Sequence, residues 1–246
     1  MAAAQYLLVG RIAAGGLEYA WVLPNTTQEA LQNSALPVRT DWVATSGRDS
    51  VAGPQLDDLA LRIAKLRAWL RLESPPDDGR FPYRLALKNT RTGALLTEGP
   101  VHDGEGYGLV IRADSASIHP SRVEKRRVYV FAIDSHGSGV LLYPQSDVLN
   151  RFPLEQPDGK YPAEIALGDA QLFTISAPFG VDTYILLTTD EAISTDALAW
   201  EGVRTRGAGV SALTTLLSNT GAATRGPQPT TPAHWSIERL TIKSVP

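Results

Sequence analysis

Cysteine is missing from all 246 residues of this chain. Without thiols the chain forms no disulfide, offers no thiolate to a metal ion and has no cysteine nucleophile. Long hydrophobic runs are missing too, because no apolar stretch approaches the ~18 residues that span a bilayer. The net charge is −3, whereas nucleic-acid-binding domains usually carry an excess of basic residues. We therefore expect a soluble protein with no membrane span and no nucleic-acid partner, and we leave its compartment open.

The N-terminal residues predict strands rather than a signal sequence, because no basic region precedes them and Arg11 interrupts their apolar run. Two strands are predicted at Gln5–Ile12 and Leu17–Leu23, joined by a turn at Ala13–Gly16. A third, short strand is predicted at Asp41–Thr45.

One amphipathic helix is predicted over Gln55–Leu72. Pro54 suits its first turn, and the proline pair at 75–76 ends it. Its apolar residues recur every three or four positions and form one stripe, made of Leu56, Leu59, Ile63, Leu66 and Leu70 with Trp69 beside it. We expect this stripe to pack on a sheet and to tie the N-terminal segment to the rest of the chain.

Residues 127–144, RVYVFAIDSHGSGVLLYP, predict a strand, a tight turn and a second strand. Both faces of Val128–Ile133 are apolar, which is typical of a strand covered on both sides in the middle of a sheet. Further strands are predicted at 83–88, 107–111, 140–143, 171–175, 183–188 and 235–242. This pattern predicts a mainly β protein, an antiparallel β-sandwich with one packed amphipathic helix.

The chain divides into three predicted parts. Residues 1–80 hold the N-terminal strands and the helix, packed on the main domain, and residues 81–190 form the β-sandwich domain. Residues 191–246 form a C-terminal extension. In that extension we predict a short helix at Ala208–Leu217, a mobile loop at 221–232 that has no large apolar side chain, and the returning strand.

Sites for chemistry are weak throughout. The four histidines, His102, His119, His136 and His234, show no metal-ligand spacing, and surface or turn positions are the simpler interpretation. The GEGYG stretch precedes a predicted strand instead of a helix, so a turn explains it better than a phosphate-binding loop. We therefore predict no catalytic residue, no metal site and no cofactor.

A basic cluster at the start of the central strand is the candidate contact surface. It consists of Arg122, Lys125, Arg126 and Arg127, and His136 in the turn after the strand is a further candidate. The cluster would suit an acidic partner surface. The alternative interpretation is a solvated strand start with Glu124 as counter-charge. Similarly, the five tryptophans would form either a sugar-binding platform or, for most of them, part of the core.

Residues 81–190 resemble an uncharacterised β-domain family found on the C-terminal side of bacterial caspase-like proteases (peptidase C14, metacaspase or orthocaspase). The stretches that carry the resemblance are FPYRLAL (81–87), DGEGYGLVIRA (103–113), RRVYVFAIDSHGSGVLLYP (126–144), YPAEIALG (161–168) and LFTISAPFGVDTYILLTT (172–189). The resemblance implies an accessory module. It does not imply the protease itself, which needs a cysteine nucleophile and a histidine base.

These observations predict a non-catalytic accessory or recognition module of a bacterial caspase-like protease system. It would act through contact with the protease domain or another protein. The alternative is a β-sandwich that binds a carbohydrate or a small ligand, and a hydrolase based on Asp and Glu pairs comes third. Oligomeric state and partner identity stay open.

Overall fold

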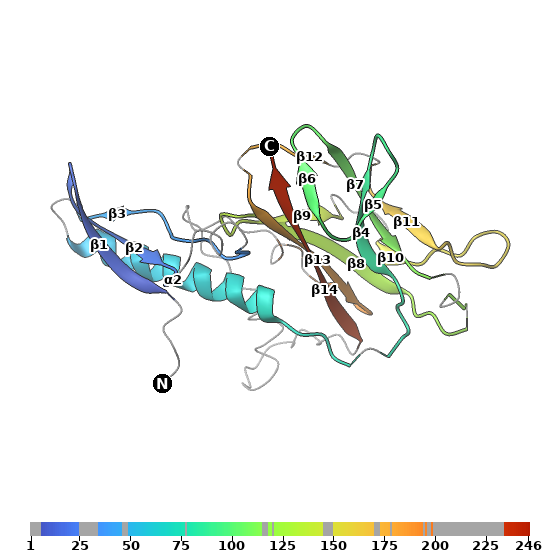
Figure 1. The fold of residues 1–246 in the computed structure, drawn as a ribbon. Coiled ribbons are helices and arrows are strands. Elements are labelled where there is room, and N and C mark those ends of the chain that lie inside the picture. The colour runs from blue at the N-terminus through green and yellow to red at the C-terminus, as the bar shows by residue number, and fades with distance from the viewer. Residues whose placement is uncertain are drawn as a thin grey trace, which may run out of the picture.

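The computed structural model describes residues 6–24, 34–45, 49–76, 78–114, 118–119, 121–144, 150–169, 173–177, 179–193, 195, 198 and 234–246. The predicted helix at 208–217 and the predicted loop at 221–232 lie outside these residues, as does Trp200. The described chain is mainly β, with two sheets packed as a sandwich, a third, smaller sheet and one helix, so the predicted fold class is confirmed (Figure 1).

Two sheets form the sandwich. The larger one has the order β10 (Arg151–Phe152), β8 (Arg126–Ile133), β13 (Val181–Thr189), β14 (Trp235–Val245) and β6 (Pro100–His102), and β9 (Gly139–Tyr143) also pairs with β8. The smaller one has the order β11 (Glu164–Leu167), β7 (Gly106–Arg112), β4 (Arg84–Asn89) and β5 (Leu95–Leu96), and β12 (Phe173–Thr174) also pairs with β7. All neighbours are antiparallel except β14 and β6. The returning strand predicted at 235–242 is therefore an interior strand of the larger sheet.

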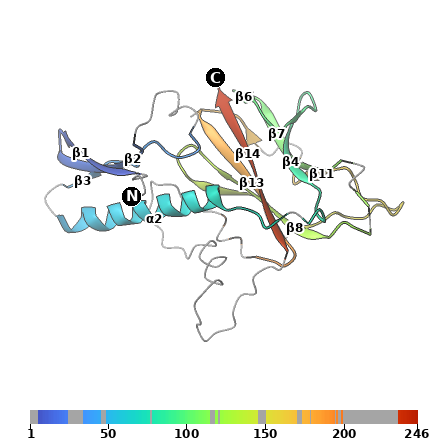
Figure 2. The same cartoon turned by 60° about the horizontal axis from the view of Figure 1, so that its bottom comes forward.

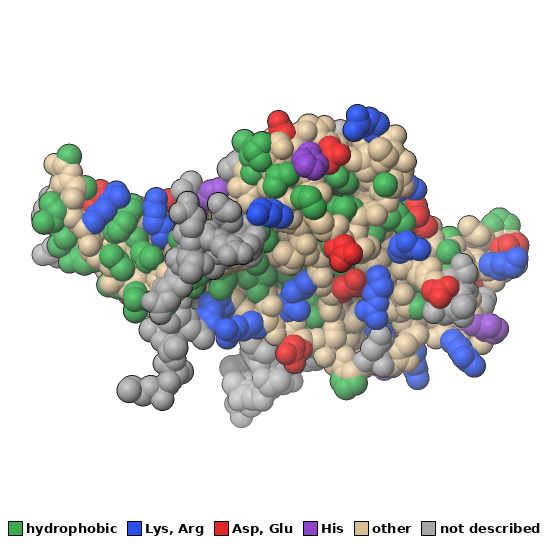
Figure 3. Space-filling model, viewed as in Figure 1, with side chains coloured by type: hydrophobic (Ala, Val, Ile, Leu, Met, Phe, Trp, Pro, Cys, Tyr) green, Lys and Arg blue, Asp and Glu red, His purple; other side chains and the backbone are tan. Residues whose placement is uncertain are grey.

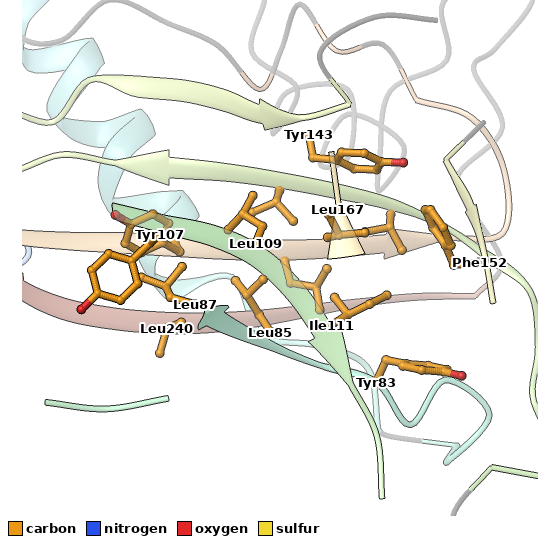
Figure 4. Close-up of a cluster of buried hydrophobic side chains, with 14 of the residues drawn as sticks. Tyr83, Leu85, Leu87, Tyr107, Leu109, Ile111, Tyr143, Phe152, Leu167 and Leu240 are labelled. Atoms are coloured by element: carbon orange, nitrogen blue, oxygen red, sulfur yellow. The ribbon is translucent and has the colours of Figure 1, made fainter. Parts of the chain in front are cut away.

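Side chains from both sheets meet in the main core (Figure 4). Because successive residues of a strand point to opposite faces, β4 contributes Leu85 and Leu87, and β7 contributes Leu109 and Ile111. Aromatic rings from both sheets join them, with Phe173 stacked against Tyr184 at 5.5 Å between ring centroids. This core aligns the two sheets face to face.

The other face of the larger sheet is covered by the C-terminal half of α2 (Asp49–Arg71). Trp69 is fully buried there and meets Phe131 edge to face, with the ring centroids 4.9 Å apart. Tyr129, Phe131 and Ile133 are each at most 2% exposed. The prediction of a buried, central strand at Val128–Ile133 is confirmed.

Polar contacts lock the end of α2 to β14. The Arg239 guanidinium donates to the carbonyl of Trp69, in the last turn of the helix, and to that of Leu72, just after it, as basic side chains commonly do at a helix C-terminus. After the helix, the Ser74 hydroxyl donates to the Ile237 carbonyl at 2.8 Å and accepts from the Ile237 N–H at 2.7 Å. The chain leaving the helix is thereby fixed to the sandwich.

The N-terminal half of α2 carries a separate small sheet. Its strands are β1 (Leu7–Ala13), β2 (Gly16–Val22) and β3 (Val43–Ala44), all antiparallel and close to the predicted positions. The Trp21 indole N–H donates to the Leu56 carbonyl at 2.9 Å. Figures 1 and 2 show this sheet on the part of the helix that extends away from the sandwich.

The helical stripe is thus shared between two sheets, which corrects the expectation that it packs on one. Leu59 and Ile63 pack under the N-terminal sheet, whereas Leu66 and Trp69 pack on the sandwich. The helix also begins six residues before Gln55, because Ala52 is buried one turn ahead of Leu56 and extends the stripe. No helix among the described residues has the length and apolar character to cross a membrane.

Candidate recognition surface

The start of β8 sends neighbouring arginines to opposite faces of the larger sheet. Val128 belongs to the core between the sheets and Tyr129 to the core under the helix. With the alternation of a strand, Arg126 lies on the side of Val128 and Arg127 on the side of Tyr129. The residues of the predicted basic cluster are therefore divided between the interior and the surface.

Arg126 is an interior residue, only 4% exposed. Its Nη2 atom lies 3.1 Å from Asp78 Oδ2 and 3.0 Å from Glu124 Oε2. The expectation that Arg126 belongs to an exposed contact surface is wrong, because strand alternation turns it inward and two carboxylates hold it there. The predicted role of Glu124 as counter-charge is confirmed for this arginine.

His234 completes the cluster around Arg126. Its Nδ1 lies 2.9 Å from Glu124 Oε1, so the residue before β14 contacts the residues before β8. Burial by itself would raise the pKa of Asp78, but a hydrogen bond from the Arg80 N–H and the charges of Arg126 and Arg80 hold that pKa below its usual value. The cluster joins three segments that are far apart in sequence, so no local pattern could have predicted it.

Metal-ligand geometry is present in the same cluster, since atoms of Asp78, Glu124 and His234 lie within 4.8 Å of one another. However, the Arg126 guanidinium contacts both carboxylates. It thus occupies the acceptor positions that a metal ion would need, and it already supplies the positive charge. We interpret the group as a structural ion cluster.

Arg127 is half-buried and lies directly opposite Arg151 in the pairing of β8 with β10. Arg127 donates to Asn150 Oδ1 at 3.1 Å, and Arg151 is exposed and donates weakly to the Lys125 carbonyl. Among the described residues, neither arginine forms an ion pair with a carboxylate. Two like charges therefore face each other here, and no acidic side chain within the described residues pairs with either of them.

Lys125 and Arg122 are the further cations that precede β8 in the chain. The Lys125 ammonium lies 5.8 Å from the centre of the Tyr161 ring, and Arg122 is exposed in the turn before β8. We call the four residues Arg122, Lys125, Arg127 and Arg151 the basic edge. The sequence pattern identified three of them and missed Arg151, whose position beside Arg127 comes from the pairing of β10.

His136 lies at the other end of β8, in the turn before β9. A strand of eight residues separates it from the basic edge by roughly 25 Å. The turn is held by Asp134, whose Oδ1 accepts the N–H groups of His136 and Ser138 at 2.8 and 2.9 Å. Gly137 adopts a φ of 78°, which suits glycine. The structure therefore does not bring His136 together with the other predicted contact residues.

Asp182 is a half-buried carboxyl next to that turn. Burial and the nearby charge of Asp134 raise its pKa, and a hydrogen bond from the Ser135 backbone opposes the rise. The two loops touch closely, because a Cβ at Gly180 would lie 2.7 Å from the Ser135 Cβ. Ser135 Oγ and His136 Nδ1 are 3.5 Å apart, at the limit of a hydrogen bond. These residues therefore mark the contact between two loops, and they do not align a nucleophile with a base.

The described tryptophans are occupied by contacts within the chain. Trp69 is core, Trp21 bonds to the helix, and Trp235 packs partly buried beside the helix-covered core. The Trp42 ring is covered by the Arg11 guanidinium, 4.1 Å from the ring centre. These residues do not form a row of exposed rings. The pocket on the smaller sheet, about 430 Å³ in volume, is lined by no aromatic residue but by Leu95, Arg112, Ala113, Asp114, Ala163 and Glu164.

No protein-family model, curated protein or solved structure matches this chain. The resemblance to caspase-associated β-domains therefore stays a prediction that rests on the sequence stretches alone. The functional argument rests on the geometry of the basic edge.

Proposed function

We propose that this protein is a non-catalytic recognition module whose basic edge binds an acidic surface of a partner protein. The observation that carries the proposal is the Arg127–Arg151 pair. Like charges directly opposite each other in a strand pair reduce stability, so the pair costs free energy in the isolated chain. A partner carboxylate between the two guanidinium groups would remove that repulsion and accept hydrogen bonds from both.

The scaffold under the basic edge supports a binding role. Arg126 and its two carboxylates fix the start of β8 from the inside, and Asn150 holds Arg127 from the side. Arginines held by a rigid framework lose less conformational entropy on binding than free side chains do. Recognition on loops and strand ends of a rigid sandwich is also common.

For the partner, we propose the caspase-like protease domain that the sequence resemblance implies. The chain has no cysteine, so it would contribute contacts and no nucleophile to such a system. A gene that encodes this chain in one reading frame with, or beside, a His/Cys protease domain would support this choice of partner.

Binding is tested by calorimetric titration of the chain with an oligo-glutamate peptide, an oligo-glutamine peptide of the same length, and the caspase-like domain. We expect the acidic peptide and the protease domain to bind and the neutral peptide not to bind. Added salt should weaken binding, because Arg122 and Arg151 are exposed and the other two cations are half-exposed, so that salt screens their charges.

Arg151→Glu is the decisive variant, with Arg91→Glu in the β4–β5 turn as the matched control at another exposed arginine. Arg151→Glu should weaken binding at least about tenfold, since it removes one attractive charge and neutralises the other. Equal effects of the two variants, or binding of the glutamine peptide as tight as that of the glutamate peptide, would contradict the proposal.

The non-catalytic part of the proposal has its own test. Peptidase, esterase, glycosidase and phosphatase assays on the isolated chain should give no turnover above background. Turnover that survives purification and disappears with one substitution in this chain would overturn it.

A further inference from the structure

The outer strand of the N-terminal sheet exposes apolar side chains on both of its faces. In β1, Leu7, Leu8 and Val9 are 37–48% exposed, and Ile12 is 91% exposed. Leu17 of β2 adds to them at 41%. Figure 3 shows this gathering of hydrophobic side chains over the β1–β2 hairpin, at the end of the molecule away from the sandwich.

The backbone of β1 also has an open side. The carbonyls of Leu17 and Trp21 accept the N–H groups of Thr45 and Thr40, both at 2.9 Å, so the odd-numbered residues of β2 bond on the β3 side. Its even-numbered residues must then bond to β1, and their partners there are Leu7, Val9, Arg11 and Ala13. The N–H and C=O groups of Leu8, Gly10 and Ile12 consequently point away from the sheet. Among the described residues, no strand pairs with this side.

Edge strands usually carry devices that prevent further pairing, such as lysine, proline, a bulge or an inward-pointing charge. β1 has no lysine, no proline and an unbroken register with β2. Its single charge, Arg11, is engaged on its own chain by Glu18, 2.7 Å away, and by the Trp42 ring. With respect to the residues that the structure describes, the edge is therefore open and apolar, and its one charge is paired.

From this edge we infer that β1 pairs antiparallel with β1 of a second copy of the chain. Outward-pointing residues face each other in such a pair, and the register that engages all three of them places Gly10 opposite Gly10 and Leu8 opposite Ile12 of the second copy. The two-fold axis then passes beside Gly10, where no side chain obstructs the approach. Ile12, the most exposed apolar side chain of the strand, becomes covered by a leucine.

A second copy fits this edge by charge as well as by shape. In the inferred register Arg11 lies opposite Val9 of the other copy, and each arginine keeps Glu18 as its own counter-charge. Neither copy therefore presents an unpaired like charge to the other. The result is one six-stranded sheet on two helices, and the two-fold symmetry closes it as a dimer.

The affinity should be modest. A seven-residue edge buries less than the about 800 Å² per partner of a standard interface, so we expect a dissociation constant in the micromolar range. The inference concerns the N-terminal sheet and is independent of the basic edge.

Sedimentation velocity on the full chain between about 1 µM and 1 mM tests the inference. We expect a concentration-dependent dimer. Ile12→Lys should weaken it at least about tenfold, while Leu61→Lys should not, because Leu61 is 71% exposed on α2 and lies off the edge. Thermal unfolding verifies that both variants fold. A wild-type chain that stays monomeric throughout, species larger than a dimer, or equal effects of the two lysines would overturn the inference.

Discussion

The larger sheet and the N-terminal sheet use similar apolar strands in opposite environments. In β8 the apolar residues that face the helix, Tyr129, Phe131 and Ile133, are at most 2% exposed, whereas in β1 every residue except the last is exposed. The difference does not come from the strand sequences, since RRVYVFAI and LLVGRIA are both apolar with one or two charges. It comes from what lies on each face.

One helix has to serve both sheets. Its C-terminal half covers the larger sheet, whose other face already packs on the smaller sheet. Its N-terminal half covers one face of the N-terminal sheet near β2 and β3 and leaves β1 at the open edge. The comparison shows that the hydrophobic pattern of a segment predicts a strand. Whether that strand is part of the core or of the surface depends on how many of its faces are covered by other elements.

The largest difference should appear in unfolding free energies. Phe131→Ala removes a fully buried ring and should destabilise the protein by about 3–5 kcal/mol. The matched substitution Ile12→Ala on β1 should cost less than about 0.5 kcal/mol in the monomer, because the side chain is 91% exposed. Urea unfolding at low protein concentration measures both losses of unfolding free energy. Similar losses for the two variants would contradict the difference in burial between β8 and β1.

The ion cluster at the start of β8 should give the next largest effect. Arg126→Met leaves the exposed carboxylate of Asp78 and the half-buried carboxylate of Glu124 without their guanidinium and should cost about 1–3 kcal/mol. Arg80→Met is the control, since Arg80 is exposed and 3.9 Å from Asp78, and should cost less than about 0.5 kcal/mol. If Arg126→Met leaves the free energy of unfolding unchanged, the ion cluster does not stabilise the start of β8.

Asp182 should make the free energy of unfolding fall as pH rises, which is the opposite of what most carboxyl groups do in folded proteins. Its pKa is raised, chiefly by burial, so the folded state binds more protons than the unfolded state between the ordinary and the raised pKa. Stability from this group therefore falls as pH rises through that range. Asp182→Asn should stabilise the protein at pH 7 by up to about 1 kcal/mol, and the gain should fade below about pH 4.

Asp158→Asn is the control of opposite sign. A hydrogen bond from the Lys160 N–H lowers the pKa of Asp158, so its contribution is present above the ordinary pKa and is lost as pH falls through the lowered one. Asp158→Asn should not stabilise the protein at pH 7. Urea unfolding at the two pH values distinguishes these signs, and a gain from Asp158→Asn equal to that from Asp182→Asn would contradict the assignment.

The smallest effect concerns the basic edge. Arg151→Glu converts a repulsive cross-strand pair with Arg127 into an attractive one and should raise stability by about 0.2–1 kcal/mol. The same variant should weaken binding of the acidic peptide. Thermal and urea unfolding of the free chain give the first value, and a loss of stability would show that the two arginines do not repel each other.

Local patterns predicted most of the fold. The spacing of apolar residues, every two positions in strands and every three to four in the helix, located the hairpin around residues 127–144, the helix and the returning C-terminal strand. Each of these elements is formed by one continuous segment, so its pattern can be recognised locally. The spacing also implied that Arg126 and Arg127 lie on opposite faces, but their adjacency was interpreted as one cluster. Strand alternation could have separated them.

Contacts between distant segments could not be predicted. Asp78, Glu124 and His234 meet only because β14 returns to the larger sheet, and Arg151 meets Arg127 only through the pairing of β10. The division of the helical stripe between two sheets has the same origin, since a stripe shows which residues are covered but not by what. The sequence therefore predicted most residues of the candidate site but did not predict how they are arranged in space.

The open edge of β1 is the central point of the comparison, and amide hydrogen exchange at two protein concentrations tests it most directly. In β8 the amides should be protected equally at both concentrations, because the larger sheet is covered within one chain. In β1 the amides of Leu8, Gly10 and Ile12 should gain protection at the higher concentration, while those of Leu7, Val9 and Arg11, already bonded to β2, should change little. Concentration-independent exchange at all six β1 positions would contradict the account.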